Sequence, residues 1–566
     1  MKSSTKRLFK QLLVVGAPLL FLVVLNPLSI HYIDRLLCIY LVDNLTEYLS
    51  THRFLTGPYE PVHKLHEGLA VNVVSKNPIP SDLHGIFIRN GPNPIRNEKL
   101  YHWFDGHGMI HSLVIDPTRS RISANYSNAF VPTPRYLADF RDQVEYFLNV
   151  GEFKGIIGLL KVLVIQPILI QVLYWTGKIP TKNGMKLGQA NTHTMMFPDG
   201  RYFMLHEGSL PFEAKLSPHG IPLSGNHVDF NGQLNFPVSA HPRIIQSLNY
   251  SSLVFHGYGG DPSQLKASNG SAVKYGELNT ATNELKYYHG LKGLENILPF
   301  MHDFIVTEKH IVFFRTSVLL DAVDAFFGKK EGPPEIFKFF PDENFAIAVV
   351  SRNPEESANV TWIELPYPAV VVHTLNGWDM KGEGKISAWA PVGYTFDGTL
   401  VKKNTNRYFM TEMIIDINKA SVSLNVISKD YNVEFPRVRD ECVGKPCRYG
   451  FSGVINEDDH FHGFVRVDTQ EKTMCFTPYQ WGDRKFIGGE PVVIPKKGKN
   501  GSDDIYLGSF VIDSSTGDNF FAVWDGQRCN GDAVVVLQTP RVPLGFHGNW
   551  ITPELFEKHL LRVTSL

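Results

Sequence analysis

Short apolar blocks recur along the chain, each preceded by a turn signal. The blocks occupy residues 201–205, 311–314, 407–410 and 520–524, and Gly, Asp, Asn or a Lys-His pair stands directly before them. Aromatic and β-branched residues favour strands, and Gly, Asp and Asn favour turns. No clear helical periodicity separates the blocks, so the pattern predicts an all-β, repetitive architecture, for which a β-propeller is the natural candidate.

The first departure from this pattern lies at the N-terminus. Residues 12–30 are apolar and uncharged, and four basic residues precede them: Lys2, Lys6, Arg7 and Lys10. This charge asymmetry is typical of a signal peptide or signal anchor. The strictly apolar part, residues 12–25, is short for a spanning helix, which needs roughly 17–25 residues. No small-residue cleavage site is obvious after it, so we predict an uncleaved membrane anchor, with a removed signal peptide as the alternative.

These features suggest a simple division of the chain. We expect a signal anchor or transmembrane segment over residues 1–33, a connector over residues 34–60 and one continuous propeller domain over residues 61–566. Six Asn-x-Ser/Thr sequons are compatible with a lumenal body: Asn44, Asn125, Asn249, Asn269, Asn359 and Asn500. We therefore expect a membrane-associated protein of the endoplasmic reticulum or secretory pathway, with a plastid or secreted form left open.

A second apolar segment lies inside the domain, at residues 154–177. Residues 154–173 are apolar apart from two lysines and two glutamines, and Pro167 divides them. One interpretation is a core helix. The other is a pair of surface helices that contacts membrane lipid while its lysines reach the headgroups. The expected contact residues are Ile156, Ile157, Leu159, Leu160, Val162 and Leu163.

Charge and cysteine content narrow the functional classes. The 55 basic and 56 acidic side chains leave a net charge of -1, so no positive field favours a nucleic-acid partner. Five cysteines are too few and too irregular for a disulfide scaffold or a zinc ribbon. Cys442 and Cys447 are either two ordinary cysteines or one local disulfide.

Four of the 22 histidines stand out by their apolar or small neighbours. They are His241 (Ser-Ala-His-Pro), His302 (Met-His-Asp-Phe), His373 (Val-Val-His-Thr) and His547 (Gly-Phe-His-Gly). Such neighbours indicate buried imidazoles, which need a partner or a metal. Their spacings of 61, 71 and 174 residues exclude a local H-E-x-x-H motif. Ligands this dispersed converge where the innermost strands of propeller blades end, so the pattern indicates an axial metal site.

Ordered motifs connect this chain to a known family. They occupy residues 85–94 (GIFIRNGPNP), 103–111 (WFDGHGMIH), 240–242 (AHP), 301–304 (MHDF), 434–437 (EFPR) and 545–548 (GFHG). In these motifs the sequence resembles the carotenoid cleavage oxygenase family nearly end to end. The resemblance implies a seven-bladed β-propeller with a helical and loop cap over one axial Fe(II) per chain. It also implies that His241, His302, His373 and His547 are the ligands.

The same resemblance assigns residues around the metal. Glu207, Glu434 and Glu490 correspond to glutamates that accept the outer N–H of the ligands, and Thr192 to a residue near the open coordination position. Such carboxylates would orient the rings and partly balance the metal charge. Four imidazoles suit iron(II) and leave two octahedral positions for O2 and water or substrate, whereas zinc would be closed by four protein ligands.

Three histidines near these motifs need separate treatment. The family commonly has Asp-Gly-Asp-Gly-Met where this chain has His107 in Asp-Gly-His-Gly-Met. We expect His107 to be a propeller-turn residue and not a fifth ligand. His206 and His193 stand beside Glu207 and Thr192, where cavity-lining and strand or surface roles are both open.

The resemblance implies a non-haem Fe(II) dioxygenase that cleaves a double bond of a carotenoid or apocarotenoid with O2. Its expected partners are a lipophilic polyene, O2 and membrane lipid. Three alternatives stand beside this reading. They are an isomerohydrolase of retinyl-type esters that needs no O2, a stilbene-cleaving oxygenase that uses a Tyr/Lys pair, and a carotenoid-binding protein without catalysis.

Overall fold

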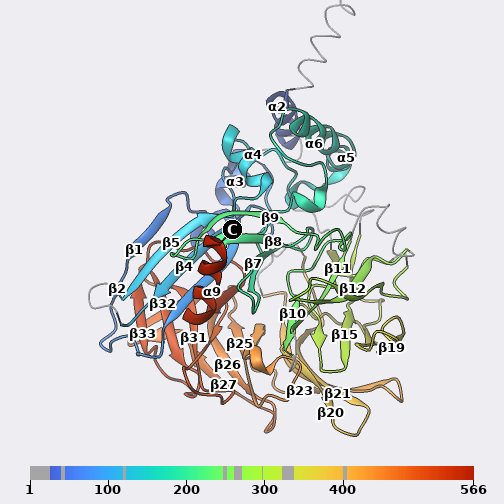
Figure 1. Cartoon of the computed structure of the whole chain (residues 1–566), viewed down its shortest axis with the longest axis vertical. Coiled ribbons are helices and arrows are strands. Elements are labelled where there is room, and N and C mark those ends of the chain that lie inside the picture. Colours follow the sequence, from blue (N-terminus) through green and yellow to red (C-terminus); the bar gives the residue numbers. More distant parts are fainter. Residues whose placement is uncertain are drawn as a thin grey trace, which may run out of the picture.

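The structure is a computed structural model that describes residues 26–39, 45–97, 99–118, 123–246, 251–259, 270–295, 297–321, 337–398 and 404–565. Antiparallel sheets make up most of it, and a group of helices lies at one end of the sheets (Figure 1). Most of the predicted anchor, residues 1–25, lies outside the described part, whose first helix is α2 (Pro27–Ile39).

One sheet joins the two ends of the domain. Its order is β1-β5-β4-β3-β34. The bounds are β1 (His66–Ala70), β3 (Gly85–Asn93), β4 (His107–Ile115), β5 (Ala124–Phe130) and β34 (Gly548–Ile551). The C-terminal β34 pairs antiparallel with β3, with Ile86 opposite Ile551. Backbone hydrogen bonds between distant parts of the chain therefore close the ring of sheets.

Four four-stranded antiparallel sheets follow in chain order. The first holds β6 (His193–Met196), β7 (Tyr202–Leu205), β8 (Phe212–Leu216) and β9 (Pro222–His227). The second holds β10 (Arg243–Gln246), β11 (Ser251–Tyr258), β12 (Val273–Asn279) and β13 (Leu285–Gly290). The third holds β14 (Ile305–Val306), β15 (His310–Arg315), β18 (Ala346–Ser351) and β19 (Val360–Glu364). The fourth holds β20 (Asn376–Met380), β21 (Lys385–Gly393), β22 (Tyr408–Asp416) and β23 (Ser421–Val426). A small pair, β16 (Val318–Leu320) and β17 (Phe337–Phe339), lies apart.

The remaining strands form one eleven-stranded sheet. One run holds β24 (Val433–Arg437), β25 (Tyr449–Ile455), β26 (Phe461–Asp468) and β27 (Thr473–Pro478). A second holds β30 (Val492–Pro495), β31 (Ile505–Asp513), β32 (Asn519–Asp525), β33 (Val535–Gln538) and the N-terminal β2 (Asn72–Val73). β28 (Gln480–Trp481) and β29 (Arg484–Gly488) join the runs. The prediction of an all-β fold is confirmed in the coarser form of a mostly-β fold, while the count of seven blades stays a prediction.

Large apolar side chains fill the spaces between neighbouring sheets. Phe87 from β3 packs with Phe510 and Phe521 of β31 and β32, with ring centroids 5.3 and 4.7 Å apart. Ile347 of β18 and Ile386 of β21 belong to another such cluster. Both faces of the strands are therefore buried, which explains the near-continuous apolar blocks of the sequence.

Of the described α-helices, all but α9 gather at one end of the sheets as a cap, and α9 (Pro553–Thr564) lies against β8 and β3 instead (Figure 1). Besides α2, the cap contains α3 (Leu45–Thr51), α4 (Pro134–Asp142), α5 (Gly155–Leu160) and α6 (Gln166–Trp175). A π-helical segment, η4 (Lys161–Ile165), links α5 to α6. The segment, for which a core helix and a pair of surface helices were both open, is therefore one continuous helix. Its wide turn, in which Gln166 N–H donates to the Lys161 carbonyl, accommodates Pro167 without a break.

The expectation that both lysines of this helix reach outward is wrong for Lys161. Its side chain is fully buried, and its ammonium contacts Glu152 and lies 3.1 Å from Asp34 Oδ1. Lys99 Nζ lies 2.6 Å from the other oxygen of Asp34. A buried charge requires such partners. Burial opposes the charged ammonium, yet Glu152 and Asp34 raise the pKa of Lys161. The ion pairs fasten α2, and with it the start of the predicted connector, to Lys161 of the long helix and to Lys99.

The outer side of the helix is apolar and open. Gly155–Trp175 has 21 residues and a mean hydropathy of 2.3, which by length and composition is enough to cross a membrane, and 28% of it is buried. Of the expected lipid contacts, Ile156, Leu160 and Leu163 are exposed, and Ile157, Leu159 and Val162 are half-buried. We call the exposed set the cap patch: Ile156, Leu160, Leu163, Val164, Ile168, Tyr174 and Trp175 of this helix with Tyr32, Ile33 and Leu36 of α2.

Candidate metal centre and cavity

The four candidate histidines occupy equivalent positions in four different sheets. His241, His302, His373 and His547 stand one to three residues before β10, β14, β20 and β34. Each of these is the edge strand of its sheet. Equivalent positions on sheets arranged around a common centre bring the side chains together, although the sequence separates them widely.

The four rings meet through their Nε2 atoms. The distance is 2.9 Å from His241 Nε2 to His302 Nε2, 3.2 Å from His302 Nε2 to His373 Nε2, and 3.2 Å from His373 Nε2 to His547 Nε2. One nitrogen from each ring lies within 4.8 Å of all the others. His241, His373 and His547 are buried, and His302 is half-buried. The structure thus brings together the complete set of predicted ligands.

Glutamates face the outer nitrogens of three of these rings. Glu434 Oε2 lies 2.6 Å from His373 Nδ1, and Glu490 Oε1 lies 3.1 Å from His547 Nδ1. Glu207 Oε1 lies 3.1 Å from His302 Nδ1 and accepts the Ala240 N–H at 3.0 Å. All three predicted glutamates therefore contact a different histidine of the cluster.

This arrangement determines the chemistry of the cluster. A carboxylate beside Nδ1 holds the ring proton there, which leaves the lone pair on Nε2. Lone pairs about 3 Å apart repel one another unless a cation lies between them. Burial and the neighbouring imidazoles lower the pKa of His241 well below its ordinary value, and burial lowers that of His547 to about 3. Four imidazoles whose Nε2 atoms are crowded in this way fit a divalent metal ion.

The long gap between His373 and His547 contains two further site positions. Glu434 lies 61 residues after His373, and Glu490 lies 57 residues before His547. Glu434 lies in β24 and Glu490 two residues before β30, so these edge strands repeat the pattern of the histidine-bearing ones. Thr192 occupies the corresponding place before β6. Edge strands of successive sheets thus each bring one site residue to the centre.

Thr192 lies where the sequence placed it, beside the cluster. Its carbonyl accepts the His547 N–H at 3.2 Å, and its hydroxyl donates to Asn191 Oδ1 at 3.0 Å. It also lines the large cavity described below. These two hydrogen bonds hold the Thr192 side chain and backbone in place beside the cluster.

A bulge in β24 orients two further residues that the sequence did not single out. The β24–β25 register shifts between Glu434 and Arg437, and Phe435 has a φ of 50°, which is unusual for a bulky residue. The Phe435 ring lies 4.7 Å from that of His373 and 4.6 Å from that of His547. The motif Glu-Phe-Pro-Arg signalled this site, but not that Phe435 covers two ligands.

Arg437 is the second missed residue. Its guanidinium binds both oxygens of Glu490, at 2.7 and 3.1 Å. It also donates to His193 Nε2 at 3.1 Å. The Nδ1 of His193 donates to the Ala240 carbonyl at 2.9 Å, so His193 is a neutral ring whose Nε2 accepts. Burial, with Arg437 beside it, lowers the pKa of His193 well below its ordinary value.

A large apolar cavity of about 660 Å³ opens on the histidine cluster. His302, His373 and His547 form part of its wall, together with Glu207, Glu434 and Thr192. Its aromatic lining comprises Phe54, Tyr59, Trp103, Phe104, Tyr258, Phe300, Phe337, Phe396, Tyr408, Phe435, Phe461 and Phe546. His206 lines this cavity, so of the two roles left open for it, the cavity-lining one is correct. Phe54 and Tyr59 come from the predicted connector, so this segment also shapes the cavity.

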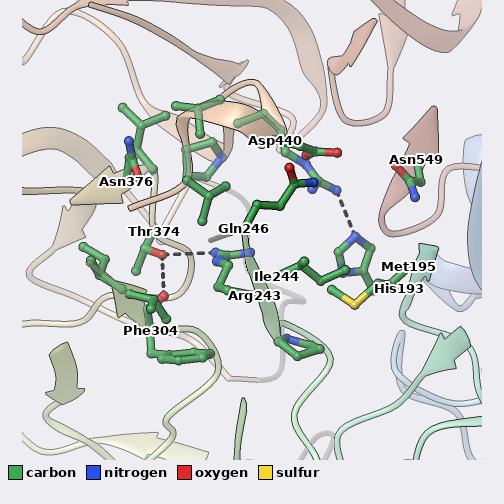
Figure 2. A pocket seen from close by; sticks show the side chains of 18 of the residues that line it. His193, Met195, Arg243, Ile244, Gln246, Phe304, Thr374, Asn376, Asp440 and Asn549 are labelled. Carbon is green, nitrogen blue, oxygen red and sulfur yellow. Dashed lines mark hydrogen bonds between the residues drawn. The ribbon is translucent and has the colours of Figure 1, made fainter. Parts of the chain in front are cut away.

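A smaller, polar pocket of about 340 Å³ lies on the other side of His193. The His193 ring is 5.1 Å from that of His547, and its other side faces this pocket. Figure 2 shows Arg243, Gln246 and Asp440 around it. Arg243 is held by Asp303 at 2.8 Å. The metal centre therefore lies between an apolar and a polar space.

His107 has a structural contact and lies outside the histidine cluster. It is buried, and its Nε2 lies 3.1 Å from Asp139 Oδ2 in α4. Asp139 Oδ1 accepts the Tyr146 N–H at 3.0 Å. Burial lowers the pKa of His107. The residue that departs from the family pattern thus joins a propeller strand to the cap.

The antiparallel sheets carry four imidazoles that converge beside an apolar cavity, so the chain is a mostly-β protein whose four histidines could hold one divalent metal ion. Comparison with known sequences agrees. The sequence model of the retinal pigment epithelial membrane protein family matches residues 59–552. The chain belongs to this family, the carotenoid cleavage oxygenases, as its motifs predicted.

Curated relatives match over most of their length. A carotenoid 9,10(9',10')-cleavage dioxygenase 1 of Phaseolus vulgaris is 27% identical over 552 residues, which cover 94% of each chain. A chloroplastic 9-cis-epoxycarotenoid dioxygenase of Oryza sativa subsp. japonica is 27% identical over 84% of this chain and 72% of its own.

Solved structures share the fold. A mutant of the Synechocystis apocarotenoid oxygenase aligns with a TM-score of 0.69 at 21% identity, over 90% of this chain and 99% of its own. A lignostilbene dioxygenase of Pseudomonas brassicacearum aligns with a TM-score of 0.70 at 20% identity, over 89% and 99%. The propeller prediction is thereby confirmed at the level of the fold.

Proposed function

We propose that the chain is a non-haem Fe(II) dioxygenase that cleaves a double bond of a carotenoid or apocarotenoid into two carbonyl products. The observation that carries this proposal is the convergence of four histidine Nε2 atoms on the wall of an apolar, aromatic cavity. Family membership and relatives named as carotenoid dioxygenases support it.

His241, His302, His373 and His547 would hold the iron through Nε2. Bound there, Fe(II) supplies the activation of O2 needed to break a carbon–carbon double bond. Glu207, Glu434 and Glu490 keep the outer ring protons on Nδ1 and so direct the lone pairs inward. The aromatic wall excludes water and aligns an extended polyene, and Thr192 stands beside the cluster at the cavity surface.

We further propose that the cap seats the enzyme on a membrane. Residues 1–33 would serve as an anchor, and the cap patch would enter the lipid surface, where a polyene dissolves. The compartment in this proposal is the endoplasmic reticulum or another part of the secretory pathway, although some plant relatives are named chloroplastic. For the propeller itself we propose seven blades: the five-stranded sheet, the four four-stranded sheets, and two blades within the eleven-stranded sheet.

Of the alternatives, a stilbene cleaver is supported by the fold of one solved relative. Among the described residues, the cavity wall contains Tyr59, Tyr258 and Tyr408 but no lysine, so the Tyr/Lys pair expected for a phenolic stilbene is missing from it. The isomerohydrolase alternative differs in its independence of O2.

The decisive experiment supplies iron-loaded protein with a carotenoid, an apocarotenoid and a stilbene, under air and under nitrogen. We expect aldehyde or ketone products only with O2 and a polyene, with labelled O2 delivering oxygen to both products. His302→Ala should lose iron and activity, whereas His84→Ala, at a half-buried position beside Asp116 and outside the cluster, should keep both. Turnover without O2, or cleavage that survives in His302→Ala, would contradict the proposal.

A further inference from the structure

Four of the five cysteines lie in pairs. Cys442 and Cys447 form a disulfide with Cα atoms 5.6 Å apart, and Cys475 and Cys529 form another with Cα atoms 5.9 Å apart. Both Cα distances fall in the range that a disulfide requires. Cys38 is buried in the cap and free. The local alternative left open for Cys442 and Cys447 is thus resolved in favour of a disulfide.

The second pair is the more informative. Cys475 lies on β27 and Cys529 lies in the connection between β32 and β33, 54 residues later. The two runs of the eleven-stranded sheet bring them together, and the hydroxyl of Thr477 accepts the Asn530 N–H at 3.1 Å beside them. Cys475 is half-buried and Cys529 exposed. Surface thiols paired by the fold across a long loop are typical of proteins that mature where disulfides form, and they are rare in reducing compartments.

Two sequons have the geometry of glycan acceptors. Asn359 is exposed directly before β19, in Asn-Val-Thr, and Asn500 is exposed in the β30–β31 loop, in Asn-Gly-Ser. Asn125, by contrast, lies within β5 between β1 and β4 and is half-buried. A bulky glycan is compatible with an exposed turn and not with a half-buried strand position.

Both acceptors lie away from the cap. Figure 1 shows β19 far from α5 and α6. The Asn500 loop is held by Arg439, whose guanidinium donates to the Gly501 carbonyl at 2.9 Å, and the next residue, Asp440, lines the polar pocket. Glycans at these positions would leave the cap patch free to meet a lipid surface.

We infer that this propeller matures on the oxidising, glycosylating side of a membrane, with disulfides Cys442–Cys447 and Cys475–Cys529 and N-linked glycans on Asn359 and Asn500. The basic residues before the N-terminal apolar segment agree with this orientation, because they favour the cytoplasmic side and so direct the following chain to the lumen. The inference extends the proposed secretory location but does not depend on the enzymatic reaction.

The test uses the full chain expressed in eukaryotic cells. Microsomal protein is denatured and treated with a maleimide mass tag, with and without prior reduction. We expect one tag before reduction, on Cys38, and five after it, and two before reduction in Cys529→Ser, which frees Cys475. Because tagging follows denaturation, the count does not require a variant to be fully stable.

Glycans are read from gel mobility before and after peptide N-glycosidase. Asn359→Gln and Asn500→Gln should each remove one step of the shift, and Thr361→Ala, which keeps Asn359 but destroys its sequon, should match the first. Asn125→Gln should change nothing. Five tags without reduction, or a mobility that neither acceptor variant alters, would overturn the inference. Either result would leave the cleavage assay unaffected, so the two proposals fail separately.

Discussion

Replacing Glu490 by Gln should damage the protein far more than the same change at Glu434. The Glu490 carboxylate is 2% exposed and accepts two hydrogen bonds on each oxygen. Oε1 accepts from Arg437 Nε at 2.7 Å and His547 Nδ1 at 3.1 Å, and Oε2 accepts from Arg437 Nη2 at 3.1 Å and Gly548 N–H at 2.8 Å. Whichever way a Gln amide is turned, its NH2 group faces two donors.

Glu434 is different because only one of its carboxylate oxygens accepts hydrogen bonds. Its Oε2 binds His373 Nδ1 at 2.6 Å and the Phe435 N–H at 2.7 Å, while Oε1 is buried without a hydrogen-bond partner among the described residues. A Gln amide can keep its oxygen at the Oε2 position and lose only the charge. The cost there should be about 1 kcal/mol, the difference between a charged and a neutral hydrogen bond.

At Glu490 the change also leaves Arg437 largely buried without its counter-ion. Breaking a buried ion pair from one side costs roughly 3–5 kcal/mol. Burial alone would raise the pKa of Glu490, but Arg437 and His547 hold it well below its usual range, so the carboxylate is charged at neutral pH. We therefore expect the metal-free Glu490→Gln protein to be roughly 2–4 kcal/mol less stable than metal-free Glu434→Gln.

Urea unfolding of the two metal-free variants, followed by circular dichroism, measures this difference, and iron retention against a chelator measures the effect on the centre. Loss of such a carboxylate typically weakens metal binding by about 10–100-fold, so both variants should lose iron more readily than the parent. If the two variants unfolded at the same urea concentration with equal slopes, the argument from donor geometry would be refuted.

Three further predictions concern the cap. His107→Asp should lower the unfolding free energy by about 2 kcal/mol through repulsion from Asp139, and a second change, Asp139→Asn, should recover most of it in a double-mutant cycle. Burial raises the pKa of Asp105 to about 7, so native protein binds this proton more tightly than the unfolded chain. The free energy of unfolding of the parent, relative to that of Asp105→Asn, should therefore fall as pH rises from about 4 to 7. A rise over this range would contradict the raised pKa of Asp105. Leu163→Ser should slow cleavage of a polyene in vesicles several-fold but not in detergent micelles, whereas Leu561→Ser, equally exposed on the C-terminal helix, should alter neither.

The sequence predicted the four-histidine cluster well because two signals agreed at each position. A small or apolar neighbourhood marked His241 and His547 as buried, and the ordered motifs selected the same residues. The glutamates had no local signal, since a lone acidic residue such as Glu207 resembles any surface carboxylate. Each glutamate reaches the centre because it lies in or near an edge strand. Only the resemblance to the family indicated which glutamates do so.

The errors have a common physical origin. Lys161 stands in an apolar segment, and a lysine with such neighbours is expected to reach water. Its partner Asp34 comes from the distant α2, and Glu152 lies outside the apolar segment, so the composition of that segment reveals neither ion pair. The helix-pair alternative read Pro167 as a break because proline usually ends a helix. The π-helical segment before Pro167 is defined by its backbone hydrogen bonds, which cannot be predicted from the pattern of side chains. The bulge at Phe435 was hidden for the same reason.

Mutations should be able to change metal binding and substrate entry independently, because different parts of the fold determine them. Each histidine stands one to three residues before an edge strand, so the paired sheets, and not the cap, fix where the four Nε2 atoms meet. The predicted connector contributes Phe54 and Tyr59 to the cavity wall, and the cap helices carry the exposed apolar patch. Changes in the sheets near the ligands should therefore alter metal binding and the turnover number. Changes in the cap should alter how a polyene reaches the cavity, and so the Michaelis constant for substrate delivered in a membrane.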